Sequence, residues 1–63
     1  MTGKEAKAGR IKLGLTLDDM LRQSIKTRRQ FECFENEWIV DEDFVQYMAF
    51  EYIKRGVSSN VKT

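Results

Sequence analysis

The chain has 63 residues, enough for one small domain, and its 41% hydrophobic and 33% charged content is typical of a folded soluble domain and excludes a disordered tail. It contains no histidine, no proline and a single cysteine, Cys33, so it cannot form an internal disulfide and offers no histidine for catalysis or metal binding. The net charge of +1 hides an asymmetry: residues 1–30 hold eight basic and three acidic side chains, whereas residues 31–63 hold three basic and seven acidic ones, which indicates either a basic face for nucleic acid or an uneven scatter of charge.

Composition also sets expectations about location. One free thiol suits a reducing compartment, so we expect a cytoplasmic protein. The charged first ten residues are followed by no continuous apolar run. We therefore expect neither a signal peptide nor a membrane span, which needs about 20 apolar residues.

The first third of the chain should form two helices. Thr2 and Glu5 have the spacing of a capping box, so a helix should run from Gly3 to about Leu13 and end at Gly14, where glycine takes a positive φ without strain. The residues of its buried stripe should be Ala6, Arg10 and Leu13, with Ile11 as a further candidate. A second, short helix should follow the cap Thr16, bury Met20 and Leu21, and end in a turn at residues 24–26.

A third helix should follow this turn. Thr27 and Gln30 form another capping box, and the helix should cover Arg28 to about Asn36. The residues expected on its buried side are Phe31, Phe34 and either Ile25 or Glu35.

Residues 37–40 should form a loop that carries Trp38, and Asp41 should cap a fourth helix that ends at Gly56. We therefore expect one domain at residues 1–56 and a flexible tail at residues 57–63. The fourth helix has an apolar stripe at helical spacing, formed by Phe44, Val45, Met48, Ala49, Tyr52 and Ile53.

Three features of residues 10–36 occur together. Residues 10–15 read RIKLGL, Thr16 caps the next helix, and residues 31–36 read FECFEN, a hydrophobic-acid-x-hydrophobic-Glu-Asn pattern. With these features the segment resembles the Cro/repressor (XRE) helix-turn-helix family of lambdoid phages. The resemblance implies an all-α fold, a compact four- to five-helix lambda-repressor-like helix-turn-helix domain.

The resemblance also implies a function. Such a domain would be a small phage- or mobile-element-type transcriptional regulator that binds operator DNA as a homodimer, with its third helix in the major groove. It implies a structural pair between Arg10 and Glu35 within the fold. The residues that it places toward DNA are Thr27, Arg28, Arg29 and Cys33 at the major groove and Asn36 near a phosphate.

Four residues in the second helix and in the turn after it depart from the family pattern. The family usually has glutamine at Leu17, alanine at Leu21, an apolar residue at Ser24 and glycine at Ile25. A β-branched residue fits a left-handed conformation poorly. We therefore expect a remodelled turn, in which the apolar contact moves from position 24 to position 25.

The basic side chains at the start of the third helix suggest the chemistry of recognition. Arg28 and Arg29 could each bind guanine through two hydrogen bonds, or could be solubilising residues on an exposed face. Lys26 should neutralise a phosphate, and Cys33 should be a small groove-facing residue and not a redox site. The acidic run 41–43 is interpreted as a helix cap. We expect no enzyme, no cofactor and no metal.

Trp38, Tyr47 and Phe50 lie outside the apolar stripe and are candidates for a protein interface, although Tyr47 could instead cover the edge of the core. They motivate an alternative function, an antirepressor-like modulator that uses the helix-turn-helix fold to bind a partner repressor. The low net charge also favours this alternative, because phosphate contacts supply much of the affinity of a strong DNA-binding protein.

Overall fold

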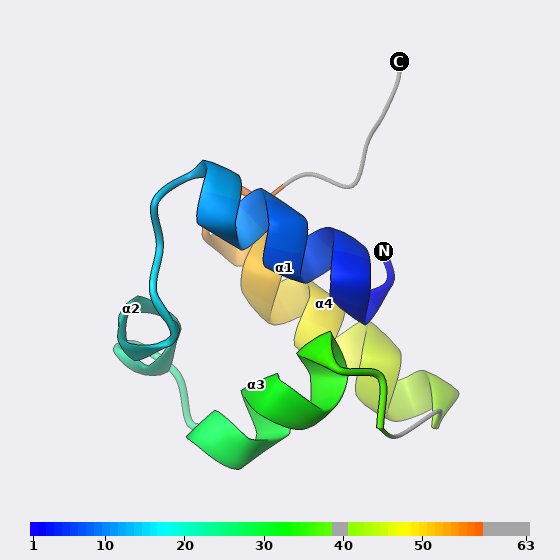
Figure 1. Ribbon diagram of the computed structural model, residues 1–63. Helices are drawn as coiled ribbons and strands as arrows, with labels where there is room; N and C mark the ends of the chain where they lie inside the picture. The colour runs from blue at the N-terminus through cyan, green and yellow to red at the C-terminus, as the bar shows by residue number, and fades with distance from the viewer. Residues whose placement is uncertain (39–40, 58–63) are drawn as a thin grey trace.

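The computed structural model describes residues 1–38 and 41–57, and all the regular secondary structure within these ranges is α-helical. The helices are α1 (Gly3–Lys12), α2 (Leu17–Leu21), α3 (Arg28–Glu35) and α4 (Glu42–Lys54). α1 packs against α3 and α4, and α3 also contacts α2 and α4, as Figure 1 shows. The expected all-α class is confirmed, with four helices in the described ranges.

Each helix begins at a side-chain cap. Thr2, Thr16 and Thr27 each accept a hydrogen bond from the third residue of their helix, whose own side chain accepts one from the cap backbone. Asp41 Oδ1 accepts from the Phe44 amide at 3.0 Å. These bonds satisfy amides that a helix start leaves unpaired, so the short helices begin at defined residues.

One core joins the helices. Its members are Ala6, Met20, Phe31, Phe34, Met48, Ala49, Tyr52 and Val57. Val57 is only 2% exposed, so the expected boundary after residue 56 is wrong by at least one residue, because the chain turns back onto the core after Gly56. The rest of the predicted tail, residues 58–63, and the loop positions 39 and 40 lie outside the described residues.

Several apolar side chains that were expected inside lie outside. Ile11, Leu13 and Ile53 are all more than half exposed. α1 turns Gly3, Ala6 and Arg10 inward instead, and α4 turns Met48, Ala49, Glu51 and Tyr52 inward. In such a small domain, the helix faces that meet one another are too narrow to cover every apolar residue.

The expected three-residue turn at residues 24–26 is also wrong. α2 already ends at Leu21, and residues 22–27 connect it to α3. Ser24 Oγ accepts from the Lys26 amide at 3.0 Å, and Ile25, at the apex between them, is 88% exposed. The apolar contact has therefore not moved to Ile25, and Ile25 does not take a positive φ.

The start of α1 lies directly against the end of α3 (Figure 1). A Cβ atom added to Gly3 would lie 1.7 Å from the Phe34 carbonyl oxygen, so only glycine fits there. The Lys4 amide donates to Glu37 Oε2 at 3.2 Å beside this contact. The sequence suggested a role for Gly3 only as the first residue of the helix.

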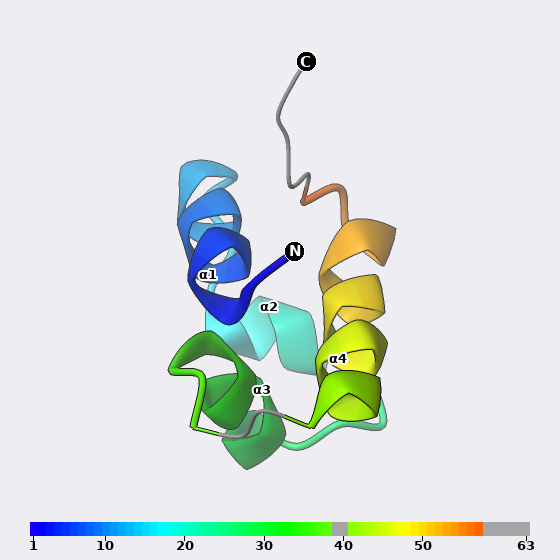
Figure 2. The ribbon, with the colours of Figure 1, turned by 90° about the vertical axis from the view of Figure 1, so that its right-hand side faces the viewer.

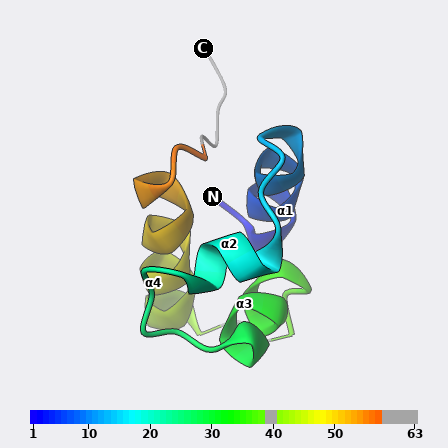
Figure 3. The same ribbon diagram turned by 90° about the vertical axis from the view of Figure 1, so that its left-hand side faces the viewer.

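The last turn of α4 holds the end of α2. Arg55 Nη2 donates to the Met20 carbonyl oxygen at 2.9 Å, and Arg55 Nη1 donates to buried Glu51 Oε1 at 3.0 Å. Figure 3 shows α2 crossing between α4 and α1 on this side of the molecule. Arg55 therefore ties the five-residue α2 to the body of the domain.

Candidate nucleic-acid interface

Basic side chains gather at the exposed start of α3. Thr27 is the N-cap, and its capping box is made by the Gln30 amide donating to Thr27 Oγ1 at 3.2 Å and the Thr27 amide donating to Gln30 Oε1 at 2.9 Å. Arg28 and Arg29 follow it in the first turn and are exposed, as is Thr27. The cap fixes the direction of the helix, and the two arginines project from its first turn.

Arg28 is not free of the domain. Its guanidinium Nη2 donates to Asp18 Oδ1 in the first turn of α2, and the two side chains remain 47% and 74% exposed. An exposed pair of this kind adds little to stability and is readily exchanged for another partner. Arg28 can therefore leave Asp18 for a phosphate or a base without opening the fold.

Two neighbouring cations lie over aromatic rings. Lys26 Nζ is 3.6 Å from the centre of the Tyr47 ring, and the Arg29 guanidinium carbon is 5.9 Å from the centre of the Trp38 ring. Each ring attracts the cation through its quadrupole and restricts where the charge can lie. None of these three cations points freely into solvent, because Arg28 is paired with Asp18 and the other two lie over aromatic rings.

Two of the expected DNA contacts lie elsewhere. Cys33 is only 7% exposed, so the expectation of a groove-facing residue is wrong, because this side of the second turn of α3 faces the body of the domain. Asn36 is exposed, but it is the C-cap, and its Nδ2 donates to the Glu32 carbonyl oxygen at 2.9 Å. The structure thus brings together Lys26, Thr27, Arg28 and Arg29, whereas Cys33 is buried and Asn36 is at the far end of α3.

A buried polar cluster supports α3 from behind. Arg10 of α1 binds Glu35 through two hydrogen bonds, Nε to Oε2 at 2.7 Å and Nη2 to Oε1 at 3.0 Å. Arg10 Nη1 also donates to the Leu15 carbonyl oxygen at 2.9 Å, and the Tyr52 hydroxyl of α4 donates to Glu35 Oε2. The pair between Arg10 and Glu35 is therefore present, and it links α1, α3 and α4 at one point.

The protonation states of this cluster follow from its contacts. The hydrogen bond to Glu35 raises the pKa of the Arg10 guanidinium, so Arg10 stays charged. Burial, and then the hydrogen bond to Glu35, raises the pKa of the Tyr52 phenol well above its usual value of 10.0, so Tyr52 stays a neutral donor. All donors of the cluster remain protonated near neutral pH.

An acidic side chain, Asp18, lies on the same face as Arg28, and Asp19 follows it in the chain. Asp18 and Asp19 occupy the first turn of α2, and hydrogen bonds from the Thr16 backbone and hydroxyl lower the pKa of Asp19. Both groups suit the positive end of a helix. They also repel phosphate, so the face is less favourable to DNA than its cations alone suggest.

The sequence did not predict two partners in this region. The sequence does not single out Asp18, because its contact with Arg28, ten positions along the chain, depends on how α2 lies against α3. Tyr52 was placed in the apolar stripe. A tyrosine in place of phenylalanine there was the available signal, because a buried hydroxyl needs a partner.

The three aromatic residues suggested as a protein interface are exposed. Trp38, Tyr47 and Phe50 each show more than half of their surface to solvent. Trp38 borders an open hollow between α3 and α4 that is also lined by Arg29, Gln30, Cys33 and Phe44. The core therefore does not need these rings for its own packing.

Comparisons with protein-family models, curated proteins and solved structures find no match to this chain. No helix in residues 1–38 and 41–57 is long and apolar enough to cross a bilayer. Over the same ranges, no group of three or more histidine, cysteine, aspartate or glutamate residues could hold a metal ion.

Proposed function

We propose that this protein is a small transcriptional regulator of the phage or mobile-element type that binds operator DNA through a helix-turn-helix formed by α2 and α3. The observation that carries the proposal is the capped start of α3, where exposed Arg28 and Arg29 lie in the first turn and half-buried Lys26 directly precedes the cap Thr27. In this mode α3 enters the major groove with its first turn leading, Arg28 and Arg29 reach base edges, and Lys26 neutralises a phosphate.

The frame behind α3 supports the same proposal. Recognition of bases requires a helix whose direction is fixed, and the buried contacts of Glu35 with Arg10 and Tyr52 fix the end of α3 that lies away from DNA. The resemblance of residues 10–36 to the Cro/repressor family adds to this support. The domain would be a member with a remodelled connection at residues 22–27.

Asp18 gives the proposal a specific energetic feature. DNA binding must replace the contact of Arg28 with Asp18 and must bring phosphates near Asp18 and Asp19. We therefore expect modest affinity that rises when Asp18 is neutralised. Asp18→Asn should tighten binding by about threefold or more at low salt, because one repulsive charge is removed and Arg28 is released.

Fluorescence anisotropy with labelled random duplexes at low salt tests the proposal. The double variant Arg28→Ala/Arg29→Ala should weaken binding by at least about tenfold and flatten its salt dependence. The matched control, Lys4→Ala/Lys7→Ala, removes the same charge from exposed positions of α1 and should have a smaller effect. Absence of binding by the wild type, or equal loss in the two double variants, contradicts the proposal.

A second function is favoured by one observation, the exposure of Trp38 beside the hollow between α3 and α4. An antirepressor-like modulator would use that surface to bind a partner repressor. Co-purification of a DNA-binding regulator that is lost on Trp38→Ala and retained in Lys7→Ala supports this function. Tight DNA binding by the protein alone, unaffected by Trp38→Ala, argues against it.

A further inference from the structure

An exposed strip runs along the outer side of α4. It consists of Asp43, Tyr47, Phe50 and Lys54, four exposed residues spaced by four, three and four positions. This spacing aligns side chains in a single seam, as in a coiled coil. Tyr47 and Phe50 are each 56% exposed at its centre. Figures 2 and 3 show α4 along one edge of the molecule, with the other helices on its inner side.

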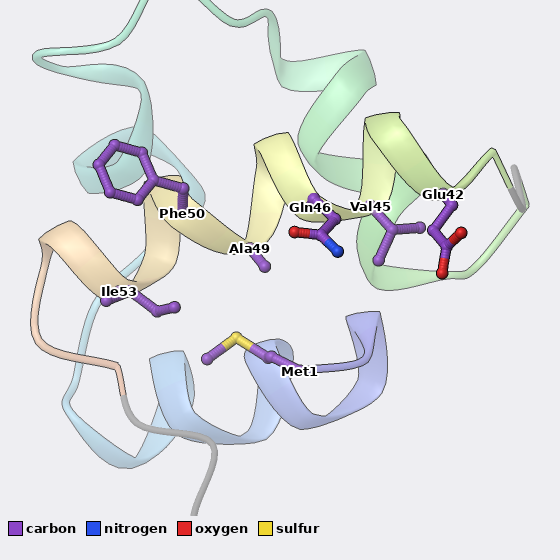
Figure 4. Close-up of a pocket in the computed structure, with 7 residues that line it drawn as sticks. All are labelled: Met1, Glu42, Val45, Gln46, Ala49, Phe50 and Ile53. Atoms are coloured by element: carbon purple, nitrogen blue, oxygen red, sulfur yellow. The ribbon is translucent and has the colours of Figure 1, made fainter.

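Both borders of this strip are built by the domain itself. On one side Lys26, from the connection between α2 and α3, lies over the Tyr47 ring. On the other side Met1 lies near Ala49 and Ile53 in a shallow groove, and Figure 4 shows the Phe50 ring directed away from Met1. Phe50 lines one edge of this groove, but its ring points away from Met1 and remains available for contact from outside.

The order of chemical types along the strip is self-complementary. An acidic residue, Asp43, stands at one end and a basic residue, Lys54, at the other, with the two aromatic rings between them. The midpoint of Asp43 and Lys54 is also the midpoint of Tyr47 and Phe50, between residues 48 and 49. A two-fold axis through this point would exchange the members of both pairs.

We propose that the strip is the surface on which a second copy of this chain docks through its own α4, packed antiparallel. In that arrangement Tyr47 of each copy meets Phe50 of the other, and Asp43 of each copy meets Lys54 of the other. A two-fold interface needs this kind of self-complementary patch, in which residue i meets j and j meets i. The proposal goes beyond DNA binding and does not depend on it.

The charges at the two ends of the strip favour a second copy of this chain as the partner and favour antiparallel packing of the two α4 helices. A parallel pair of α4 helices would place Asp43 beside Asp43 and Lys54 beside Lys54, whereas the antiparallel pair places opposite charges together at both ends. Lys54 Nζ lies 5.5 Å from the centre of the Phe50 ring and 3.7 Å from Glu51 Oε1 of its own helix, and in the dimer Asp43 of the second copy would join this group. An unrelated partner would have no reason to match the order of acid, aromatic, aromatic and base.

The size of the strip sets the strength of the dimer. α4 has 13 residues and is therefore about 20 Å long, which is too short for the roughly 800 Å² per partner of a standard stable interface. The dimer should form only at raised protein concentration, or where two copies are held side by side. Dilute protein should be a monomer.

Charge exchange across the strip tests the proposal by sedimentation velocity from about 10 µM to 1 mM, in the absence of DNA. The wild type should show a sedimentation coefficient that rises with concentration. Asp43→Lys alone and Lys54→Asp alone should each abolish this rise, because each places like charges at both ends of the interface. The double variant Asp43→Lys/Lys54→Asp, and an equal mixture of the two single variants, should restore it.

Two controls make the result decisive. Lys7→Asp makes the same charge change on the exposed face of α1 and should leave self-association unchanged. Circular dichroism should show that every variant keeps its helical content. A monomer at 1 mM overturns the proposal, as does a dimer that survives either single reversal or is not restored by the mixture. A monomer that instead binds a different protein through this strip also overturns it. Because no DNA is present, failure to bind DNA leaves this result unaffected.

Discussion

The buried cluster around Glu35 should dominate the stability of the domain. Glu35→Ala leaves the Arg10 guanidinium, which makes two bonds to Glu35, and the Tyr52 hydroxyl without their acceptor in the interior. Loss of one partner of a buried ion pair costs about 3–5 kcal/mol. A domain of 63 residues has an unfolding free energy of about 3–9 kcal/mol in total, at about 0.05–0.15 kcal/mol per residue.

The melting temperature is the suitable measure of this loss. One kcal/mol corresponds to about 4–8 °C in a domain of this size, so Glu35→Ala should lower the melting temperature by more than about 12 °C or unfold the protein at 25 °C. Circular dichroism at 222 nm reports the transition directly from the helices. Trp38 fluorescence is a poor probe, because its ring is exposed in the folded state.

An exposed pair and a double-mutant cycle test the reasoning. Asp18 and Arg28 also form an arginine–carboxylate pair, but on the surface. Asp18→Ala breaks this pair and should lower the unfolding free energy by about 1 kcal/mol or less. Arg10→Met combined with Glu35→Leu should cost less than the sum of the two single changes, because no unpaired charge remains in the core. Equal costs for Glu35→Ala and Asp18→Ala, or strict additivity in the cycle, would refute the argument.

Two further predictions concern the close approach of α1 and the protonation of the core. Gly3→Ala should destabilise the domain by about 2–3 kcal/mol in urea unfolding, because the added Cβ meets the Phe34 carbonyl oxygen, whereas Lys7→Ala should stay within about 0.5 kcal/mol; equal effects would contradict the contact. The unfolding free energy should also fall as pH rises above 10.0, because the unfolded chain releases the Tyr52 proton near that pH while the folded chain retains it, with a slope of up to about 1.4 kcal/mol per pH unit. Tyr52→Phe should show a smaller slope between pH 9 and 11, and an unchanged slope would disprove the assignment.

Local signals predicted where the helices begin. The capping boxes at Thr2 and Thr27 and the cap at Asp41 depend on residues three positions apart, so the sequence contains all the information they need. The pair of Arg10 with Glu35 spans 25 positions and was available only through the family resemblance, which supplied the relative placement of α1 and α3. Residue spacing within one helix cannot predict a contact between residues 25 positions apart.

Burial was harder to predict than helix position. Leu13 is apolar and was expected inside, yet it is exposed, because the contact face of α1 is set by how the helices cross. Cys33 was expected outside and is buried for the same reason. Ile25 is exposed because it lies at the apex of the connection between α2 and α3. The contact of Gly3 with the end of α3 depends on how closely the two backbones approach, and the spacing of apolar residues does not predict that distance.

The contact of Asp18 with Arg28 shows a similar limit for the candidate site. The cations at the start of α3 could be identified from their order in the sequence, but the acid that competes for Arg28 comes from another helix. In the proposed function, affinity for DNA would depend on both the cations and this acid, so the sequence predicts which residues form the candidate site better than how tightly that site would bind.

The bond from Arg55 to the Met20 carbonyl oxygen means that α2 is held in place by the residue that follows α4. A truncated protein that stopped at Lys54 would retain the sequence of every helix and still lose both this link and the side chain of Val57. Residues 55–57 therefore hold α2 against the domain, and we expect α2 to be the first helix to unfold in a protein shortened to Lys54.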